Sequence, residues 1–384
     1  MATQLRPRLG LAALAVSQVV TWGVLYYAIL VAAPAIAADT GWGEETIFLI
    51  VTAALLTSAA CAAPAGHWLD HHPRRIMLVG AVTGTVAVLA TAAAPNVGLF
   101  ATAWIIGGAA QSAILYQAAF TVITHRHGQA RRTPLTIITL AGGLASTFFA
   151  PITGWLVSET GWRVTFVVLA GTLAVVVIPA YALTVERSWA SVQTQTDVST
   201  AAPTVITSMR FWLLTLALAL LSFSLYSVTL SAVPASAEKG LDLQAASWVL
   251  GLIGAGQVLG RLVYLAIPHG TAPWIAATAV GVAGAGFLAG YAIAAQPGWI
   301  IATAIVTGAI RGALTLVQAS AVSDRWGTTG YGRLNGTLAA PVAALTALAP
   351  GTAATVATTL GSYQAMGLLM AAVCLTGGLL AVRR

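Results

Sequence analysis

The chain has 384 residues, of which 58% are hydrophobic and only 7% are charged, and its mean hydropathy is +0.88. Soluble domains contain about 25% charged residues, and disordered chains combine high charge with few apolar residues, so this composition excludes both classes. A formal net charge of +7 does not by itself indicate nucleic-acid binding in so apolar a chain, and we expect no nucleic-acid partner.

Twelve apolar stretches follow one another along the chain, each long enough to cross a bilayer, which needs about 20 residues per helix. Their continuity lacks the alternation that is typical of membrane β-strands. The predicted fold class is therefore an all-α polytopic membrane protein with twelve transmembrane helices. We expect these helices at 10–38, 46–69, 75–93, 97–124, 134–158, 163–184, 209–237, 243–267, 271–294, 297–323, 334–357 and 361–381.

One long polar stretch, 185–208, separates the sixth apolar segment from the seventh. Its Ser, Thr and Gln content is typical of a flexible linker. We predict an N-terminal six-helix half at 1–184, a cytoplasmic linker at 185–208 and a C-terminal six-helix half at 209–384.

The two predicted halves share residues at a constant offset of 200 positions. Tyr26 in the first segment corresponds to Tyr226 in the seventh, and Gln111 in the fourth corresponds to Arg311 in the tenth. We interpret the shared offset as a parallel repeat of six helices, the layout of transporters that bind substrate near the bilayer midplane.

The positions of the basic residues predict the orientation of the chain. With the N-terminus in the cytoplasm, the external connections hold only Arg163 and Lys239. Cytoplasmic loops are enriched in Arg and Lys, so both termini are expected in the cytoplasm. The basic residues that this orientation places on the cytoplasmic side are Arg6, Arg8, Arg74, Arg75, Arg126, Arg131, Arg132, Arg187, Arg210, Arg325, Arg333, Arg383 and Arg384.

The connection between the second and third segments reads Gly66-His-Trp-Leu-Asp70-His-His-Pro-Arg74-Arg75. This stretch resembles the signature of the major facilitator superfamily in the same loop, a glycine followed by an aspartate and a basic pair. We expect Asp70 to act in gating, paired with Arg74 or Arg75 or with helix ends of the other half. The alternative is a turn that only sets topology.

Arg311 is predicted near the bilayer midplane, where a charge is expensive and marks a functional site by default. No acidic residue falls in the middle of any predicted segment, so Arg311 could bind an anion, with Gln111 as its polar repeat partner. The alternative is an arginine held by helix carbonyls for structure.

Gln257 and Arg261 lie one helical turn apart in the eighth segment, so both can face one ligand. Gly254 to Arg261 resembles the corresponding span of the monocarboxylate transporter and oxalate/formate exchanger branch, where the resemblance implies an arginine that contacts the substrate carboxylate. Arg261 could instead extend to the cytoplasm. Four tyrosines offer hydroxyls beside apolar rings, or simply pack: Tyr26, Tyr27, Tyr116 and Tyr226.

These patterns together predict a secondary active transporter of small organic anions, monocarboxylate-like, that works by alternating access in the inner or plasma membrane. Protons or a counter-anion could couple transport, and we expect a monomer. The alternative is efflux of drug-like or amphipathic compounds by proton antiport. The sequence shows no nucleophile arrangement, phosphate loop or metal-ligand cluster, so we expect neither an enzyme nor a cofactor or metal.

Overall fold

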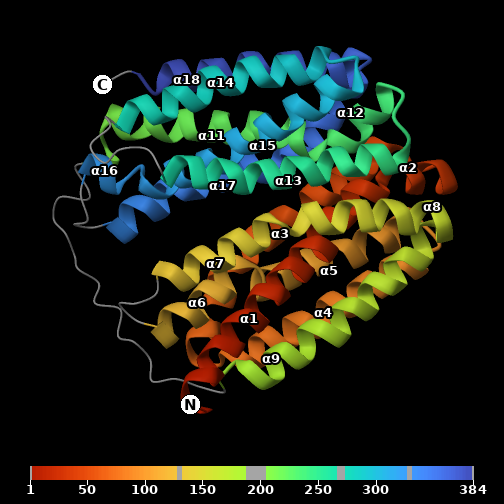
Figure 1. Ribbon diagram of the computed structural model, residues 1–384, viewed down its shortest axis with the longest axis vertical. Helices are drawn as coiled ribbons and strands as arrows, with labels where there is room; N and C mark the ends of the chain where they lie inside the picture. Colours follow the sequence, from red (N-terminus) through yellow and green to blue (C-terminus); the bar gives the residue numbers. More distant parts are fainter. Residues whose placement is uncertain (1, 128–131, 187–204, 266–272, 327–330, 383–384) are drawn as a thin grey trace. The chain divides into compact units, whose positions relative to one another are not determined.

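The computed structural model describes residues 2–127, 132–186, 205–265, 273–326 and 331–382, and every regular element in these ranges is a helix (Figure 1). The earlier helices are α1 (Ala2–Trp22), η1 (Gly23–Tyr27, a π-helix), α2 (Ala28–Thr40), α3 (Glu44–His71), α4 (Pro73–Ala93), α5 (Val97–Ile114), α6 (Tyr116–His127), α7 (Arg132–Gly143), α8 (Ala145–Thr172), η3 (Leu173–Val177, a π-helix) and α9 (Ile178–Thr184). The later helices are α11 (Met209–Leu230), α12 (Ala232–Glu238), α13 (Leu243–Leu265), α14 (Pro273–Ile293), α15 (Pro297–Ser320), α16 (Ser323–Trp326), α17 (Tyr331–Leu360) and α18 (Tyr363–Leu380).

Eleven helical stretches in the described part of the chain are long and apolar enough to cross a membrane. One of them, Thr133–Thr184, has 52 residues, which is about 78 Å of helix against a hydrocarbon core of about 30 Å. Its backbone turns at Gly161, whose φ of 77° lies in the left-handed region that glycine adopts without steric cost. The stretch therefore supplies two crossings, and the predicted polytopic all-α fold is confirmed.

Packing divides the chain into two compact units, Met1–Gln193 with Leu243–Gly251 and Thr194–Asp242 with Leu252–Arg384. In the first unit, α5 packs between α3 and α4, and α8 lies against α4. In the second unit, α14 packs against α15 and α18, and α11 packs against α17 and α18. Most of the predicted linker, residues 187–204, lies outside the described residues.

Helix positions follow the offset that the sequence repeat predicts, since α4 and α14 begin 200 residues apart, as do α5 and α15. A backbone contact repeats as well. A Cβ atom at Gly108 of α5 would lie 2.2 Å from the Ala54 carbonyl oxygen of α3. A Cβ atom at Gly308 of α15 would lie 2.1 Å from the Ile253 carbonyl oxygen of α13. Each unit thus brings its second and fourth membrane helices together at an equivalent glycine.

Cations cap the C-terminal ends of α4 and α14, where helix carbonyls lack partners within the helix. Arg163 Nη1 donates hydrogen bonds to the carbonyl oxygens of Ala92 and Ala94 at 2.8 and 2.9 Å. Lys239 Nζ donates to the two carbonyl oxygens that lie 200 residues further along, at 2.6 and 2.9 Å. The two basic residues predicted outside the cytoplasm therefore have a structural role at equivalent helix ends.

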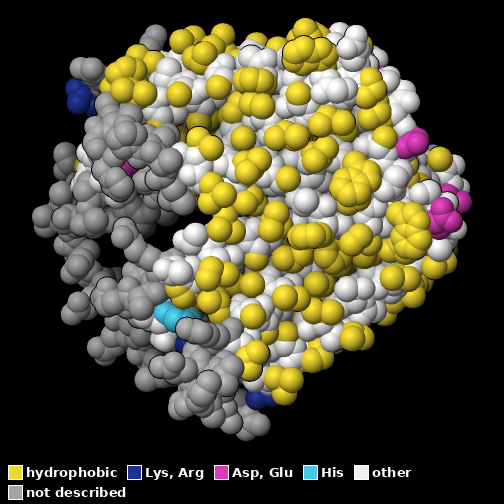
Figure 2. All heavy atoms as spheres, in the orientation of Figure 1, with side chains coloured by type: hydrophobic (Ala, Val, Ile, Leu, Met, Phe, Trp, Pro, Cys, Tyr) yellow, Lys and Arg dark blue, Asp and Glu magenta, His cyan; other side chains and the backbone are white. Residues whose placement is uncertain are grey.

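Large apolar side chains face outward along the membrane-spanning helices, as expected for a surface that lipid covers. On the face shown in Figure 2, hydrophobic side chains spread over the helices, whereas the visible charged side chains lie toward helix ends. Examples of exposed apolar residues are Val79, Trp155, Val175 and Leu183. The chain is therefore a multi-pass membrane protein.

Candidate functional site

Arg311 lies in the middle of α15 and is only 2% exposed. Its Nη1 donates a hydrogen bond to Thr229 Oγ1 at 3.1 Å, and its guanidinium carbon lies 4.0 Å from the centroid of the Tyr226 ring. Such a cation–π contact contributes about 0.5–2 kcal/mol. The structure thus brings two of the predicted substrate residues together, on α11 and α15. Thr229 was missed in the sequence, although it lies three residues after Tyr226 and hence on the same helix face.

Arg261 and Gln257 are buried on α13, with 6% and 5% of their surfaces exposed. Arg261 Nε donates to Thr315 Oγ1 of α15 at 3.3 Å. Thr315 follows Arg311 by four residues, so Arg311 and the residue that contacts Arg261 lie on neighbouring turns of α15. Gln257 Oε1 is buried and has no hydrogen-bond partner among the described residues, which leaves a polar atom one turn from Arg261.

Glycines bring α13 and α15 into direct backbone contact. A Cβ atom at Gly256 or Gly260 would lie 2.1 or 1.8 Å from a carbonyl oxygen of α15. A Cβ atom at Gly308 or Gly312 of α15 would likewise lie 2.1 or 2.0 Å from a carbonyl oxygen of α13. Small residues at four-residue spacing allow such close packing in lipid. The helices that carry Arg261 and Arg311 therefore have little freedom to separate or slide.

Aromatic side chains cluster around the π-helix η1 of the first unit. The Trp22 ring lies 5.0 Å from that of Tyr26 and 4.9 Å from that of Tyr116, and Tyr26 lies 5.0 Å from Tyr27. The Tyr116 hydroxyl donates to the Thr139 carbonyl oxygen at 3.0 Å. Three predicted tyrosines therefore gather around Trp22. Trp22 was not among the predicted site residues, yet its indole Nε1 is buried with no hydrogen-bond partner in the described part of the chain.

Gln111 is buried on α5 and its side-chain Nε2 donates to the Leu25 carbonyl oxygen at 2.9 Å. Leu25 lies within η1, where the wider turn alters the backbone hydrogen-bonding pattern and often marks a functional position. The structure therefore places the amide group of Gln111 on the backbone of the first span. The corresponding position in the repeat, Arg311, contacts side chains instead.

The fourth membrane span is interrupted at Leu115, between α5 and α6, where ψ is −162°. The Ile114 carbonyl oxygen accepts two hydrogen bonds at this break, from Gln18 Nε2 at 2.8 Å and from the Tyr181 hydroxyl at 3.2 Å. Gln18 lies on α1 and Tyr181 on α9. Side chains of the first and sixth spans thus stabilise the break, at the point where Tyr116 begins α6.

Asp70 lies at the end of α3, with 53% of its side chain exposed, and its Oδ1 is 3.7 Å from His125 Nε2 on α6. Arg74 and Arg75 lie in the first turn of α4, half-buried and exposed respectively. The structure therefore gives Asp70 a histidine contact that the sequence analysis did not anticipate. This contact is an ion pair when His125 is protonated.

Residues 14–288 match the family model described as Major Facilitator Superfamily. No curated protein matches the sequence.

Solved structures resemble the fold over nearly its full length. A bacterial homologue of the human lysosomal transporter Spinster, inward-facing and unoccupied, shares 15% identity with a TM-score of 0.75 and covers 98% of this chain and 96% of its own. The occupied form shares 14% identity, with a TM-score of 0.76 and the same coverage. A mutant of the nucleoside transporter NupG shares 14% identity with a TM-score of 0.78, over 97% of this chain and 98% of its own.

Proposed function

The chain belongs to the Major Facilitator Superfamily, and we propose that it carries small organic anions, monocarboxylate-like, across the membrane. Membership makes the protein a membrane transporter and not an enzyme. Transporters of this fold move their substrate by alternating access around a site near the bilayer midplane. The substrate class is the part that the proposal adds.

The observation that carries the proposal is the buried guanidinium of Arg311 at the centre of α15. Nine of the ten acidic residues of the chain fall in the ranges that the structure describes, and these nine lie at helix ends, next to the Gly161 turn or in connections. An anionic substrate would place a negative charge next to the buried guanidinium of Arg311. Arginine binds a carboxylate through two parallel, charge-assisted hydrogen bonds, and its planar fork suits that geometry.

Neighbouring groups support a small ligand with one charged end. Arg261 and Gln257 lie on α13, which glycines hold against α15. The unpartnered Oε1 of Gln257 marks an amide that could hydrogen-bond a ligand in either orientation. We assign Arg311, Arg261, Gln257 and Tyr226 to substrate contact.

The first unit offers further candidate substrate contacts of its own. Its aromatic cluster consists of Trp22, Tyr26, Tyr27 and Tyr116, and the indole Nε1 of Trp22 is a buried donor available to a ligand acceptor. Gln111 supports this cluster through its hydrogen bond to the Leu25 carbonyl oxygen.

Gating is assigned to Asp70 with Arg74 and Arg75, at the ends of α3 and α4. The contact between Asp70 and His125 joins this connection to α6, which starts at the Leu115 break. A movement of α6 would therefore shift Tyr116 and change the contact between Asp70 and His125. We place these residues on the cytoplasmic side of an inner or plasma membrane, and propose anion exchange or proton symport as the coupling.

A second candidate function is efflux of amphipathic compounds. The aromatic cluster of the first unit favours it, because its four large rings form a chain of contacts about 5 Å apart, and aromatic rings supply much apolar contact area. In that case Arg311 would serve Tyr226 and Thr229 as a structural residue.

Uptake into proteoliposomes distinguishes the two functions. Radiolabelled short-chain monocarboxylates are offered with and without a pH gradient, to the wild type and to Arg311→Lys and Arg311→Gln variants. Loss of one charge-assisted contact costs about 1.5–3 kcal/mol, so Arg311→Gln should raise the half-saturating anion concentration roughly 10- to 150-fold. Arg311→Lys should weaken binding less, and Arg210→Gln, at an exposed helix start, should leave uptake unchanged.

Folding of each variant is checked by size-exclusion profile and thermal stability. Efflux of a cationic dye that survives Arg311→Gln, with no anion uptake by the wild type, would replace the anion proposal with the second candidate. A variant that fails to fold would make Arg311 structural.

A further inference from the structure

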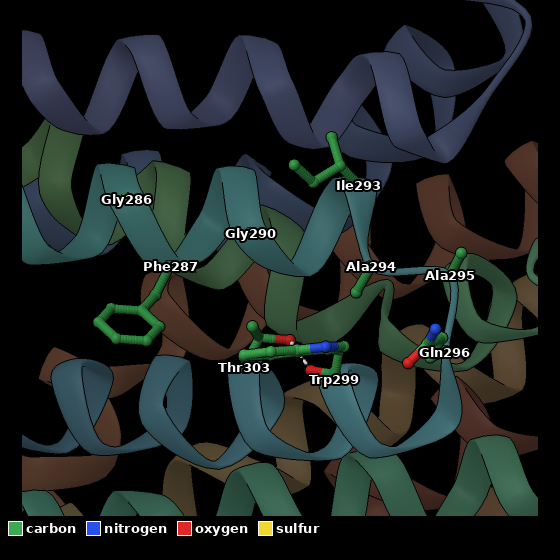
Figure 3. A pocket seen from close by; sticks show the side chains of 9 residues that line it. All are labelled: Gly286, Phe287, Gly290, Ile293, Ala294, Ala295, Gln296, Trp299 and Thr303. Carbon is green, nitrogen blue, oxygen red and sulfur yellow. Dashed lines mark hydrogen bonds between the residues drawn. The ribbon is translucent and has the colours of Figure 1, made fainter.

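A groove opens between α14 and α15 of the second unit, away from the residues assigned to the substrate. Its volume is about 460 Å³, and its lining includes Gly286, Phe287, Gly290, Trp299 and Thr303. Figure 3 shows Phe287 extending from α14 toward α15 and the indole of Trp299 lying between the two helices beside Thr303. The Thr303 hydroxyl is used within α15, as a donor to the Trp299 carbonyl oxygen at 2.6 Å. The walls are therefore mainly apolar.

Two glycines create this groove. A Cβ atom at Gly286 would meet nothing within 4 Å, and one at Gly290 would meet only the Thr303 methyl group at 3.4 Å. Gly286 and Gly290 therefore differ from Gly256 and Gly260, because their spacing serves no close helix contact within the described chain. The sequence pattern is the same, and here it leaves space.

The first unit fills the equivalent positions. At the repeat offset of 200, Gly286 corresponds to Val86 and Gly290 corresponds to Ala90. Val86 is 58% exposed on α4, so a valine is compatible with this helix surface. The groove is thus a feature that distinguishes the second unit from the first at a place where helix positions otherwise repeat.

Position relative to the bilayer indicates what fills the groove. Gly286 lies seven residues before the end of α14 at Ile293, which is about 10 Å along the helix axis. Ile293 and Trp299, exposed by 61% and 64%, stand at the helix ends, where a tryptophan is typical of the membrane interface. The polar end, at Gln296, lies in the connection between α14 and α15. The groove therefore runs from the headgroup level into the hydrocarbon.

The volume of the groove distinguishes two candidate occupants, a hydrocarbon chain and a helix of a second copy of the protein. Two turns of a helix about 11 Å wide occupy on the order of 1,000 Å³, more than twice the volume of the groove. Phe287 and Trp299 also project into the space that a partner helix would need for backbone contact with the two glycines. A single flexible chain fits between them.

We propose that the groove between α14 and α15 is a binding site for one acyl chain of a bilayer phospholipid, with the headgroup at the Gln296 end. The inference concerns this face of the second unit and is independent of the transported substrate. Burial of the acyl chain against Phe287 and Trp299 would fix its position. A phospholipid would then be held next to α15, the helix that carries Arg311.

A photoactivatable phospholipid tests the proposal. The purified full chain is reconstituted with a phosphatidylcholine that carries a diazirine in its acyl chain, irradiated, and digested for mass spectrometry. Labelling is expected to concentrate on residues 286–303. In a Gly286→Val, Gly290→Ala double variant, which restores the residues of the first unit, it should fall about fivefold or more while labelling of other helices stays unchanged.

Gly171→Val provides the matched control. Gly171 lies on the exposed surface of α8, and a Cβ atom there also meets nothing within 4 Å. This variant should label like the wild type at 286–303. Gly286→Val alone, whose Cβ atom would meet no protein atom within 4 Å, covers the case in which the double variant folds poorly.

Two results would overturn the assignment. Even labelling of all lipid-facing helices, unaltered by the glycine substitutions, would mean that lipid does not bind the groove specifically. Efficient disulfide linkage of two copies through Gly290→Cys, in a background with Cys61 and Cys374 replaced, would instead identify the occupant as a second copy of the chain.

Discussion

The Ile114 carbonyl oxygen offers a direct test of how the broken fourth span is stabilised. Gln18 and Tyr181 both donate to this one acceptor, at 2.8 and 3.2 Å, and both side chains are buried completely. Removal of either donor leaves the carbonyl one partner. Removal of both leaves a carbonyl that the break at Leu115 has already separated from regular helix bonding.

Free energies of unfolding should therefore be non-additive. A side-chain hydrogen bond within a membrane protein contributes about 0.6 kcal/mol on average, so Gln18→Leu and Tyr181→Phe should each cost about that much. A buried carbonyl without any donor costs about 1–3 kcal/mol. The two single costs sum to about 1.2 kcal/mol, so we expect the double variant to exceed that sum by up to about 2 kcal/mol, as a coupling energy.

SDS titration in mixed micelles, followed by circular dichroism, measures these free energies. The control cycle pairs Gln18→Leu with Tyr291→Phe, because Tyr291 is equally buried but its hydroxyl bonds to Ala232 and Ser236 of the second unit. That pair should be additive. Additive costs for Gln18 and Tyr181 as well would refute the idea that the two side chains share one acceptor.

Three further outcomes follow from the packing and the contacts. Gly260→Ala should cost about 1–3 kcal/mol of stability, because the new Cβ atom would lie 1.8 Å from a carbonyl oxygen of α15, whereas Gly286→Ala should cost little; thermal unfolding in detergent compares the two. Gln111→Leu should also lower stability by about 1–3 kcal/mol, because the amide of Gln111 donates to the Leu25 carbonyl oxygen. The half-saturating substrate concentration should stay constant, and a large change in it would mean that Gln111 contacts the substrate. Asp70→Asn should slow transport and raise thiol labelling from the cytoplasmic side without loss of insertion, and normal transport would reduce the loop to a topology element.

Hydropathy and charge were sufficient to predict the fold, because the bilayer admits so few structures. The twelve predicted segments correspond to the observed crossings, and the turn at Gly161 falls between the segments predicted at 134–158 and 163–184. A constant offset in the sequence likewise predicted the equivalent positions of α4 and α14 and of α5 and α15. These features depend on composition and spacing, which a single sequence displays directly.

Individual contacts could not be predicted in the same way. The π-helical turn at Leu25 and the break at Leu115 contain no proline to mark them, so nothing in the sequence indicated that Gln111 and Gln18 would bond to backbone carbonyls. Asp70 was expected near a basic pair that follows in sequence, whereas His125 is 55 residues away and reaches it through the packing of α6. Side-chain partners depend on tertiary geometry. Here the helix irregularities at Leu25 and Leu115 leave backbone carbonyl oxygens available as acceptors for buried side chains.

The capped ends of α4 and α14 bear on how a duplicated chain diverges. Both halves need a cation at the same pair of carbonyls, yet Arg163 arrives from the helix that opens the sixth crossing, whereas Lys239 arrives from the end of the seventh. Position 39, the counterpart of Lys239, holds an aspartate that accepts the Trp162 indole hydrogen at 2.9 Å. Each half thus depends on its own set of contacts at this helix end. A chimaera that exchanges first helices between the halves would place two cations at one helix end and none at the other, so the halves are not interchangeable at this point.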